Sequence, residues 1–407
     1  MRKRKIYFIG GIFPPGYDVM KFSKGPIQYA ADGLQKSILM GLAESKVDCE
    51  ILNLPFVGSF PLRYKFARIG DSEFKFSYKN FEIKGYNIGF ENLILYKLYS
   101  RYICLRRKLE WMLENEYSAG KDIVLMIYSI HTPFLKASVD VKKRFPDVKI
   151  VQIVPDLPEY MESNKSLLRD VLERLNDKIL QRCYGFIDGY VLLSEYMSEK
   201  LPILNKPQIV VEGIYQKNEF VSSIQQNIEG KYILYTGTLS KRYGILNLVN
   251  AFALIKDIDC KLVICGDGDT KEEIIEASSK DNRIKYLGQV SQAVSRSLQK
   301  KASLLVNPRT SEGDYTKYSF PSKTMEYLGT GIPTLIYRLP GIPNEYYKYC
   351  FSLSELGVIP LANKIKEIMG MNPKDLARIG QNARKFILRE KTPMKQVGKI
   401  LLMLDKI

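Results

Sequence analysis

The sequence predicts an α/β protein built from two Rossmann-like, doubly wound domains that face a cleft. Short apolar segments alternate with amphipathic helical patterns along the whole chain, which is typical of parallel sheets covered by helices. The length of 407 residues exceeds what one hydrophobic core usually supports. A mostly polar stretch at residues 216–229 separates the two halves of the pattern and is interpreted as the linker.

Each half contains a series of predicted strands. The strands cover residues 6–9, 49–52, 123–128, 149–154, 189–193 and 209–211 in the first half, and 232–235, 261–265, 284–287, 304–306 and 334–336 in the second. We expect residues 1–218 to form the N-terminal domain, 219–390 the C-terminal domain, and 391–407 a last helix. Because ligands of such folds bind at the carboxyl ends of the strands, the loops that follow the strands are the candidate sites.

The composition argues against several classes of protein. The six cysteines are scattered without paired short spacing, which disfavours a zinc site or a disulfide framework and favours a reducing, cytoplasmic setting. The basic start is followed by an apolar run that Gly10 and Gly11 interrupt, so we interpret it as a first strand and not as a signal peptide. No stretch approaches the roughly 18 apolar residues that a membrane span requires.

The net charge of +17 indicates an anionic partner, which could be nucleic acid, a membrane surface or the substrate. No nucleic-acid motif accompanies the charge. The basic residues are densest at residues 60–108, where they alternate with Phe and Tyr: Arg63, Lys65, Arg68, Lys75, Lys79, Lys84, Lys97, Arg101, Arg106, Arg107 and Lys108. This mixture suits the headgroup layer of an anionic membrane, and a solvated, irregular part of the first domain is the alternative.

Residues 303–335 combine a strand, a loop with Gly and Pro, and the start of a helix. The helix is predicted to begin near Pro321–Ser322 and carries Lys323 and Glu326 on one face. The unpaired N–H groups of a helix start suit a phosphate, Lys323 adds a full charge, and Glu326 can accept hydrogen bonds from sugar hydroxyls. The segment therefore predicts a nucleotide site, with an ordinary capped helix as the alternative.

A second loop, GTLSKRYG at residues 237–244, follows the first strand of the second half. Gly237 lets the backbone approach a ligand closely, and Lys241 and Arg242 supply charge for a diphosphate. A solvated Lys-Arg pair at a helix start is the alternative.

These motifs resemble the glycosyltransferases of family 4. The string FPSKTMEYLGTGIP is similar to the donor-site sequence of that family, and four further strings follow its order and spacing: YTGTLSKRYGILNLVNAF, KLVICGDGD, IKYLGQVS and GYVLLSEYMSEKL. The resemblance covers essentially the whole chain, strongly in the C-terminal half and loosely before residue 120. It implies the GT-B architecture, retention of the anomeric configuration, no metal, and a last helix that crosses back to the first domain.

The resemblance also implies a donor site in the second domain. Its predicted residues are Gly237, Thr238, Lys241, Gly266, Val290, Tyr318, Ser319, Phe320 and Glu326, with Arg242 and Lys323 as cations on the departing diphosphate. The string Asp267-Gly268-Asp269 is the best candidate for a metal-binding pair, but the family uses its glycines for close packing, so we predict no metal site.

The sequence departs from the family pattern at three positions. Thr238 and Tyr243 replace the usual Arg and Lys, so the phosphate cation is assigned to Arg242, with Lys241 as the alternative. Tyr318 replaces the first of two glutamates that seven intervening residues separate in the family, and Tyr318, Tyr315, Glu312 or no residue takes that role. Ser319 and Phe320 are expected to act through their backbone amides.

The first domain contributes fewer candidates. His131, the single histidine, follows the strand at 123–128 and matches a family histidine beside the donor sugar, with a structural hydrogen bond as the alternative. Gly10 and Gly11 are interpreted as cleft lining. Asp156 is expected on the acceptor side, where it would hold or activate a hydroxyl, and a structural turn is equally compatible.

These features favour a hexosyltransferase that moves a sugar from a UDP- or GDP-linked donor to a saccharide or lipid-linked acceptor. The expected setting is bacterial capsule or exopolysaccharide synthesis at the cytoplasmic face of the membrane, with no other cofactor and no nucleic acid. A sugar-nucleotide epimerase of the same fold is the alternative, although one histidine without an identifiable carboxylate network disfavours it. A non-catalytic polyanion-binding protein or a degenerate enzyme is also compatible with the charge and the missing glutamate.

Overall fold

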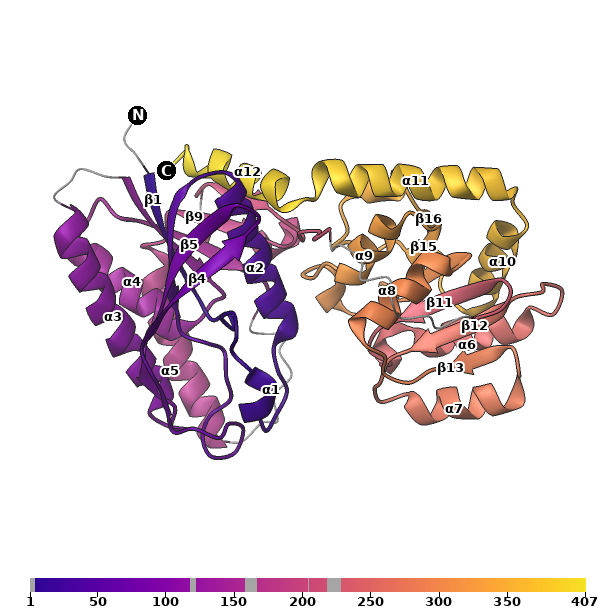
Figure 1. The fold of residues 1–407 in the computed structure, drawn as a ribbon, viewed down its shortest axis with the longest axis horizontal. Coiled ribbons are helices and arrows are strands. Elements are labelled where there is room, and N and C mark those ends of the chain that lie inside the picture. The colour runs from indigo at the N-terminus through magenta and orange to yellow at the C-terminus, as the bar shows by residue number, and fades with distance from the viewer. Residues whose placement is uncertain (1–3, 118–121, 158–166, 204, 218–227) are drawn as a thin grey trace. The chain divides into compact units, whose positions relative to one another are not determined.

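The computed structural model describes residues 4–117, 122–157, 167–203, 205–217 and 228–407, and the side chains of residues 167–173 are not described. The described chain forms two compact units, one from Met1–Ile214 with Pro393–Ile407 and one from Tyr215–Thr392 (Figure 1). The predicted boundaries at 218 and 390 lie within four residues of these limits. Most of the predicted linker, residues 218–227, lies outside the described residues.

The N-terminal unit is built on an eight-stranded sheet in the order β10-β9-β8-β7-β1-β2-β5-β4. Its strands are β1 (Arg4–Gly10), β2 (Asp48–Asn53), β4 (Ser72–Tyr78), β5 (Phe81–Asn87), β7 (Asp122–Tyr128), β8 (Lys149–Val154), β9 (Gly189–Leu192) and β10 (Gln208–Val210). Neighbouring strands are parallel except for the antiparallel β4–β5 hairpin. The hairpin was not predicted, because its strands are exposed and charged where the other strands are buried and apolar.

Helices cover this sheet on both faces, as in a doubly wound fold. They are α1 (Val19–Phe22), α2 (Tyr29–Glu44), α3 (Lys97–Glu116), α4 (Thr132–Arg144), α5 (Leu167–Tyr184) and α12 (Pro393–Leu404), with a 3₁₀ turn at Glu195–Glu199. Helices α3, α4 and α5 pack side by side, and α12 packs along α2 (Figure 1). Gly41 on α2 allows α12 to pack this closely, because a Cβ at position 41 would lie 2.4 Å from the Pro393 carbonyl oxygen.

The C-terminal unit contains a six-stranded, fully parallel sheet in the order β13-β12-β11-β14-β15-β16. Its strands are β11 (Tyr232–Thr236), β12 (Lys261–Cys265), β13 (Ile284–Tyr286), β14 (Leu304–Asn307), β15 (Thr334–Tyr337) and β16 (Phe351–Leu353). Its helices are α6 (Ile245–Leu254), α7 (Lys271–Lys280), α8 (Gln292–Lys301), α9 (Ser322–Thr330), α10 (Val358–Met369) and α11 (Pro373–Glu390). Apolar side chains pack on both faces of the sheet, so the predicted α/β fold class is confirmed.

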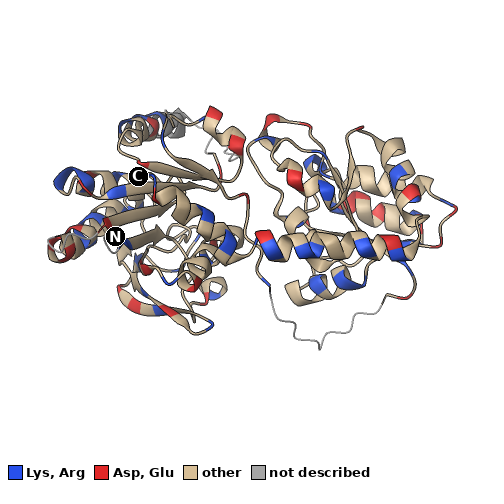
Figure 2. Cartoon of the chain, turned by 90° about the horizontal axis from the view of Figure 1, so that it is seen from above, with Lys and Arg blue, Asp and Glu red and all other residues tan. Residues whose placement is uncertain are grey.

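The insertion between β2 and β7 is more ordered than predicted. Besides the β4–β5 hairpin and helix α3, it contains a small antiparallel sheet of β3 (Arg68–Ile69) and β6 (Phe90–Glu91). Lys and Arg are spread over both units and alternate with Asp and Glu (Figure 2). Within the described part of the chain, no helix combines the length and the apolar character needed to cross a membrane.

Candidate active site

Two glycine loops touch at the carboxyl ends of β11 and β12. The Gly237 N–H donates to the Cys265 carbonyl at 3.0 Å, and Gly266 has a φ of 147°. A Cβ on Gly266 would lie 1.8 Å from the Gly237 carbonyl oxygen, so only glycine allows this crossing. The two glycines predicted from the sequence therefore lie together at the carboxyl ends of these two strands.

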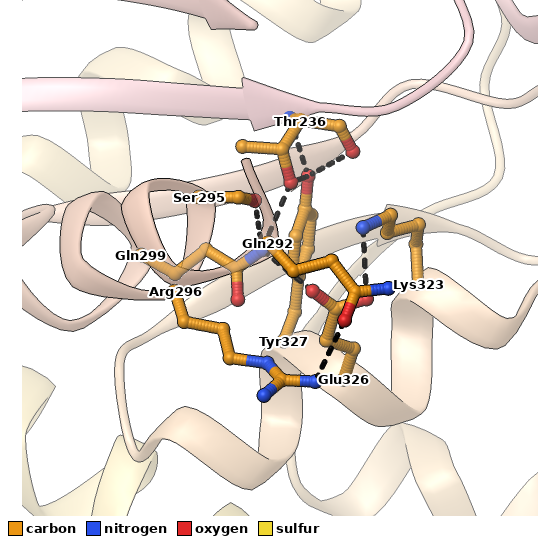
Figure 3. A network of polar contacts seen from close by, with 8 residues as sticks. All are labelled: Thr236, Gln292, Ser295, Arg296, Gln299, Lys323, Glu326 and Tyr327. Atoms are coloured by element: carbon orange, nitrogen blue, oxygen red, sulfur yellow. Dashed lines mark hydrogen bonds and ion pairs between the residues drawn. The ribbon is translucent and has the colours of Figure 1, made fainter. Parts of the chain in front are cut away.

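Glu326 is held in one orientation by two neighbours on different helices (Figure 3). Gln299 Nε2 on α8 donates to Glu326 Oε1 at 2.7 Å, and Lys323 Nζ, one turn earlier on α9, lies 2.8 Å from Glu326 Oε2. Gln299 is completely buried, whereas the carboxylate and the ammonium are half-buried. The arrangement leaves a pre-oriented carboxylate that can accept further hydrogen bonds on its open side.

The same network ties α9 to the end of β11. The buried Tyr327 hydroxyl accepts a hydrogen bond from the Thr236 N–H at 2.8 Å and donates to the Thr236 carbonyl at 3.1 Å. Gln299 Nε2 also lies 2.9 Å from Thr236 Oγ1. Burial raises the pKa of Tyr327, so its hydroxyl keeps the proton that this pattern requires. Gln299 and Tyr327 were not predicted, because nothing in the sequence marks these polar groups as partners of residues elsewhere in the chain.

A second cluster of two arginines and two tyrosines lies in the loops after β11 and β14. The guanidinium carbon of Arg242 lies 5.1 Å from the ring centres of both Tyr243 and Tyr315. The guanidinium carbon of Arg309 lies 5.5 Å from the Tyr243 ring and 4.8 Å from the Tyr315 ring. The Tyr315 hydroxyl donates to the Arg242 carbonyl at 3.0 Å, which joins the two loops. Arg309 was not among the residues predicted from the sequence, although its position two residues after a buried parallel strand is typical of ligand-binding residues in this fold class.

The other predicted donor-site residues fall into two groups. Thr238, Lys241 and Arg242 are exposed at the loop after β11, and Val290 is half-buried after β13. Tyr318 and Phe320 are buried, and Phe320 packs 5.3 Å from the Tyr346 ring in the core. The Phe320 side chain is thus part of the core, which leaves only its backbone for a ligand.

The Asp267-Gly268-Asp269 loop serves packing contacts. Asp269 accepts hydrogen bonds from the Lys241 N–H at 3.1 Å and from Ser240 Oγ at 3.2 Å. A Cβ on Gly268 would lie 2.3 Å from the Leu239 carbonyl oxygen. Among the described residues, no group of three or more His, Cys, Asp or Glu side chains is placed to hold a metal ion.

His131 lies in the N-terminal unit at the start of α4, in a cluster of aromatic rings and cations. Its ring stacks on Phe134 and Phe56 at 4.5 and 5.7 Å between ring centres. Its Nε2 lies 3.0 Å from an Nη of the buried Arg101, which also donates to the Pro55 carbonyl. Burial and the charges of Arg101 and Lys97 hold the pKa of His131 well below its ordinary value. The imidazole is therefore neutral, with Nε2 as acceptor and the proton on Nδ1.

The predicted acceptor-side residues differ in exposure. Gly10 and Gly11 are buried, and the Gly11 N–H donates to Gln35 Oε1 at 2.8 Å, so this group is not offered to a ligand. A Cβ on Gly11 would lie 2.5 Å from the Phe56 ring, which explains the glycine by packing against the ring that stacks on His131. Asp156 is exposed after β8, and residues 158–160, which the sequence analysis grouped with it, lie outside the described residues.

The basic and aromatic region predicted at residues 60–108 divides into separate parts. Lys75, Lys79 and Lys84 of the β4–β5 hairpin pair with Glu82, Glu44 and Glu73, and Arg101 is buried. Exposed apolar side chains gather elsewhere, in a set that we name the apolar patch: Met20, Leu62, Phe66, Leu93, Ile94, Leu95 and Leu98. Leu95 is 85% exposed, Leu62 71% and Met20 70%.

Backbone hydrogen bonds bring the three segments of the apolar patch together. The Lys24 N–H donates to the Arg63 carbonyl at 3.0 Å, and the Phe60 N–H donates to the Asn92 carbonyl at 2.9 Å. Four exposed cations belong to the same segments: Lys21, Lys24, Arg63 and Lys65. The patch thus joins apolar side chains and positive charge on one part of the N-terminal unit.

The C-terminal unit resembles a known protein family in sequence, and the whole chain resembles solved structures in fold. Residues 216–386 match the family model described as glycosyl transferases group 1. No curated protein matches the chain. Solved structures similar over their full length include sucrose-phosphate synthase from Thermosynechococcus elongatus, with 14% identity, a TM-score of 0.63, and coverage of 99% of this chain and 98% of that chain.

Two further structures show the same similarity of fold. The lipopolysaccharide outer core galactosyltransferase WaaB, in its apo form, is 12% identical with a TM-score of 0.60 and 99% coverage of each chain. Alr3699/HepE from Anabaena, in complex with UDP, is 13% identical with a TM-score of 0.60, and the match covers 99% of this chain and 100% of that chain. The GT-B architecture is confirmed. The C-terminal unit contains a glycosyl transferases group 1 domain, so the prediction of a glycosyltransferase is confirmed at this level.

Proposed function

We propose that this chain is a retaining, metal-independent glycosyltransferase of the family 4 type that uses a nucleoside-diphosphate sugar as donor. Its acceptor is a saccharide or a lipid-linked saccharide in the synthesis of a bacterial capsule or exopolysaccharide. The observation that carries the proposal is the Glu326 carboxylate, fixed by Gln299 and Lys323 beside the touching glycine loops of β11 and β12.

This carboxylate suits the ribose of the donor. A ribose presents two adjacent hydroxyl donors, and a charged acceptor held in place binds them without paying for its own ordering on binding. The start of α9 and Lys323 provide N–H groups and a positive charge next to the same carboxylate. HepE supports a donor of this class, since that protein has been solved with UDP and with UDP and glucose.

In the proposed reaction, an acceptor oxygen forms a bond to the anomeric carbon while the bond from that carbon to the diphosphate oxygen breaks. The acceptor proton passes to the departing diphosphate, so no separate base is needed. Lys323 and Arg242 stabilise the negative charge that develops on the diphosphate. The neutral His131 donates from Nδ1 to a hydroxyl of the donor sugar and acts neither as nucleophile nor as base.

The first experiment measures donor binding in the presence of EDTA. Thermal unfolding is followed with UDP, GDP and their sugar conjugates for the wild type and for Glu326→Ala. Loss of hydrogen bonds to a charged acceptor weakens binding by about 2 kcal/mol, or roughly thirtyfold, so the rise in Tm should be much smaller in the variant at the same ligand concentration. Glu272→Ala, which removes an exposed carboxylate on α7 of the same unit, is the matched control and should behave as the wild type.

Three results would contradict the proposal. If no nucleoside diphosphate raises the Tm of the wild type at millimolar concentration, the donor site is wrong. If binding needs a divalent cation that EDTA removes, the metal-independent mechanism is wrong. Transfer with inversion of the anomeric configuration, seen by NMR of the product, would overturn the retaining mechanism.

Contact with the cytoplasmic face of the membrane completes the proposal. The apolar patch supports it, because exposed Leu and Ile side chains on adjoining segments that also carry exposed Lys and Arg match the interface of an anionic bilayer. The wild type is expected to sediment with vesicles that contain phosphatidylglycerol and to remain in solution with phosphatidylcholine alone.

A variant pair tests this surface. Leu62→Glu with Leu95→Glu should abolish sedimentation, whereas Ile359→Glu, at a site 65% exposed in the C-terminal unit, should not change it. Because the substituted side chains are exposed, the free energy of unfolding should change by less than about 0.5 kcal/mol. Equal sedimentation of the double variant and the wild type would contradict membrane contact through the apolar patch, and a concentration-dependent dimer that the double variant loses would identify a protein interface.

A further inference from the structure

Arg309 is a charged side chain that the described protein does not neutralise. It lies two residues after β14 and is only partly exposed, and no carboxylate of the described residues lies within ion-pair distance of its guanidinium. An Nη of Arg309 donates to Ser319 Oγ at 2.7 Å, the Tyr315 side chain is a further polar neighbour, and the Nε is buried without a partner among the described residues. A partly buried cation without an anion is costly, which points to a negatively charged ligand.

The surroundings of Arg309 fix where such a ligand would lie. The rings of Tyr243 and Tyr315 flank the guanidinium at 5.5 and 4.8 Å, which restricts its plane. Ser319 donates in turn to the Tyr315 carbonyl at 2.8 Å, so the loop that leads into α9 is tied to the same group. Arg309 thus lies at the start of the segment that carries Lys323.

Arg309 also adjoins the loop after β11. The Tyr235 hydroxyl donates to the Thr238 carbonyl at 2.7 Å, and the charge of Arg309 acts on that phenol. Position 238 holds a neutral threonine and position 243 a tyrosine that packs on the Arg309 guanidinium. Residues 238 and 243 of the loop after β11 are therefore uncharged, and Arg309 from the loop after β14 places a positive charge beside them.

We propose that Arg309 binds the diphosphate of the donor, as a rigid, bidentate cation supplied by the loop after β14. This inference rests on the proposed function and names a donor-binding residue that the sequence motifs do not contain. Tyr243 and Tyr315 set the orientation of the guanidinium and leave its fork of N–H donors for two phosphate oxygens. Arg309 therefore contributes to the affinity for the phosphates and not to the affinity for the nucleoside.

The test compares ligands that differ only in phosphate. Isothermal titration with uridine, UMP and UDP is carried out on the wild type, Arg309→Gln and Arg309→Lys, with the guanine series in parallel. Arg338→Gln is the matched control, because Arg338 also stacks on a tyrosine of this unit, 4.4 Å from the Tyr347 ring, and belongs to no part of the site.

We expect Arg309→Gln to weaken diphosphate binding by about tenfold or more while the affinity for the nucleoside stays the same. Arg309→Lys should lose a smaller factor, since an ammonium cannot bind two oxygens in one plane. An unchanged ratio of diphosphate to nucleoside affinity in Arg309→Gln would overturn the inference and leave the proposed function intact.

If Arg309→Gln does not fold, the Lys variant decides the question. A ratio at least threefold below that of the wild type supports the inference, and the wild-type ratio overturns it. If the wild type binds no nucleotide of either series, both the inference and the proposed function are wrong.

Discussion

The two units surround their candidate residues in opposite ways. In the C-terminal unit, the charged side chains after β11 and β14 and at the start of α9 are half-buried or exposed. In the N-terminal unit, His131 and Arg101 are enclosed by the rings of Phe56, Phe90 and Phe134. The first arrangement suits recognition of an anion that arrives from solvent, and the second suits a neutral hydrogen-bonding group whose protonation state is fixed.

The comparison shows that a fully buried arginine and a partly exposed arginine have different roles. Arg101 is 2% exposed and makes its hydrogen bonds to the Pro55 carbonyl and the His131 ring, so it holds a loop and an imidazole in place. Arg309 donates to the Ser319 hydroxyl, has no carboxylate of the described residues within ion-pair distance, and is partly exposed, so it is open enough to accept a ligand. A cation with protein acceptors on several sides supports the fold, and a cation without them is available for function.

The largest expected effect tests whether the C-terminal site depends on the touching glycine loops. Gly266→Ala places a Cβ against the Gly237 carbonyl at a φ of 147°, so strain and overpacking should lower the free energy of unfolding by about 4 kcal/mol. Urea denaturation measures the change. Gly33→Ala on α2 of the other unit is the control, because its Cβ meets no atom within 4 Å, and it should be neutral or slightly stabilising. A loss below 1 kcal/mol for Gly266→Ala would show that the loops can separate.

The second prediction concerns Arg101 as a structural cation. Arg101→Gln leaves the Pro55 carbonyl and His131 Nε2 without their donor and removes the contact with the Phe90 ring at 4.5 Å. The free energy of unfolding should fall by about 3 kcal/mol. Arg107→Gln, an exposed arginine on the same helix, should change it by less than about 0.5 kcal/mol. Equal effects of the two substitutions in chemical denaturation would remove the distinction between the two kinds of cation.

The smallest of the three effects is a pH dependence that only the N-terminal cluster should produce. The pKa of His131 is lower in the folded state than the ordinary value of 6.5, so the unfolded state takes up a proton first as the pH falls. The stabilisation from neutral His131 is complete above pH 6.5 and is lost below it, by up to about 2 kcal/mol at pH 5.

The measurement compares the free energy of unfolding at pH 7 and pH 5 for the wild type and His131→Gln. The wild type should lose more stability than the variant over this interval, because other titrating groups contribute to both. The activity should show no step between pH 6 and pH 8 that disappears in the variant. A step of that kind would mean that His131 titrates in the folded protein and is less enclosed than its contacts indicate.

Much of the fold could be predicted, since buried parallel strands are short apolar runs that stand out in the sequence. Strands β8 and β12 match their predicted bounds, and α9 begins at Ser322 as predicted and ends before Gly331, whose φ of 86° terminates the helix. The β4–β5 hairpin and β16 were missed. Hairpin strands with one solvated face and an edge strand of three residues give no continuous apolar signal.

The sequence by itself determined the two α/β halves and the motif that contains Lys323 and Glu326, because local periodicity and helix-start chemistry are properties of neighbouring residues. Only the tertiary structure decided which residues join that motif. Gln299 and Arg309 come from α8 and from the loop after β14, and they reach the site because parallel strands bring the ends of separate segments to one edge of the sheet. The contact between the buried Arg101 and His131 likewise depends on packing between α3 and α4, which no local pattern encodes.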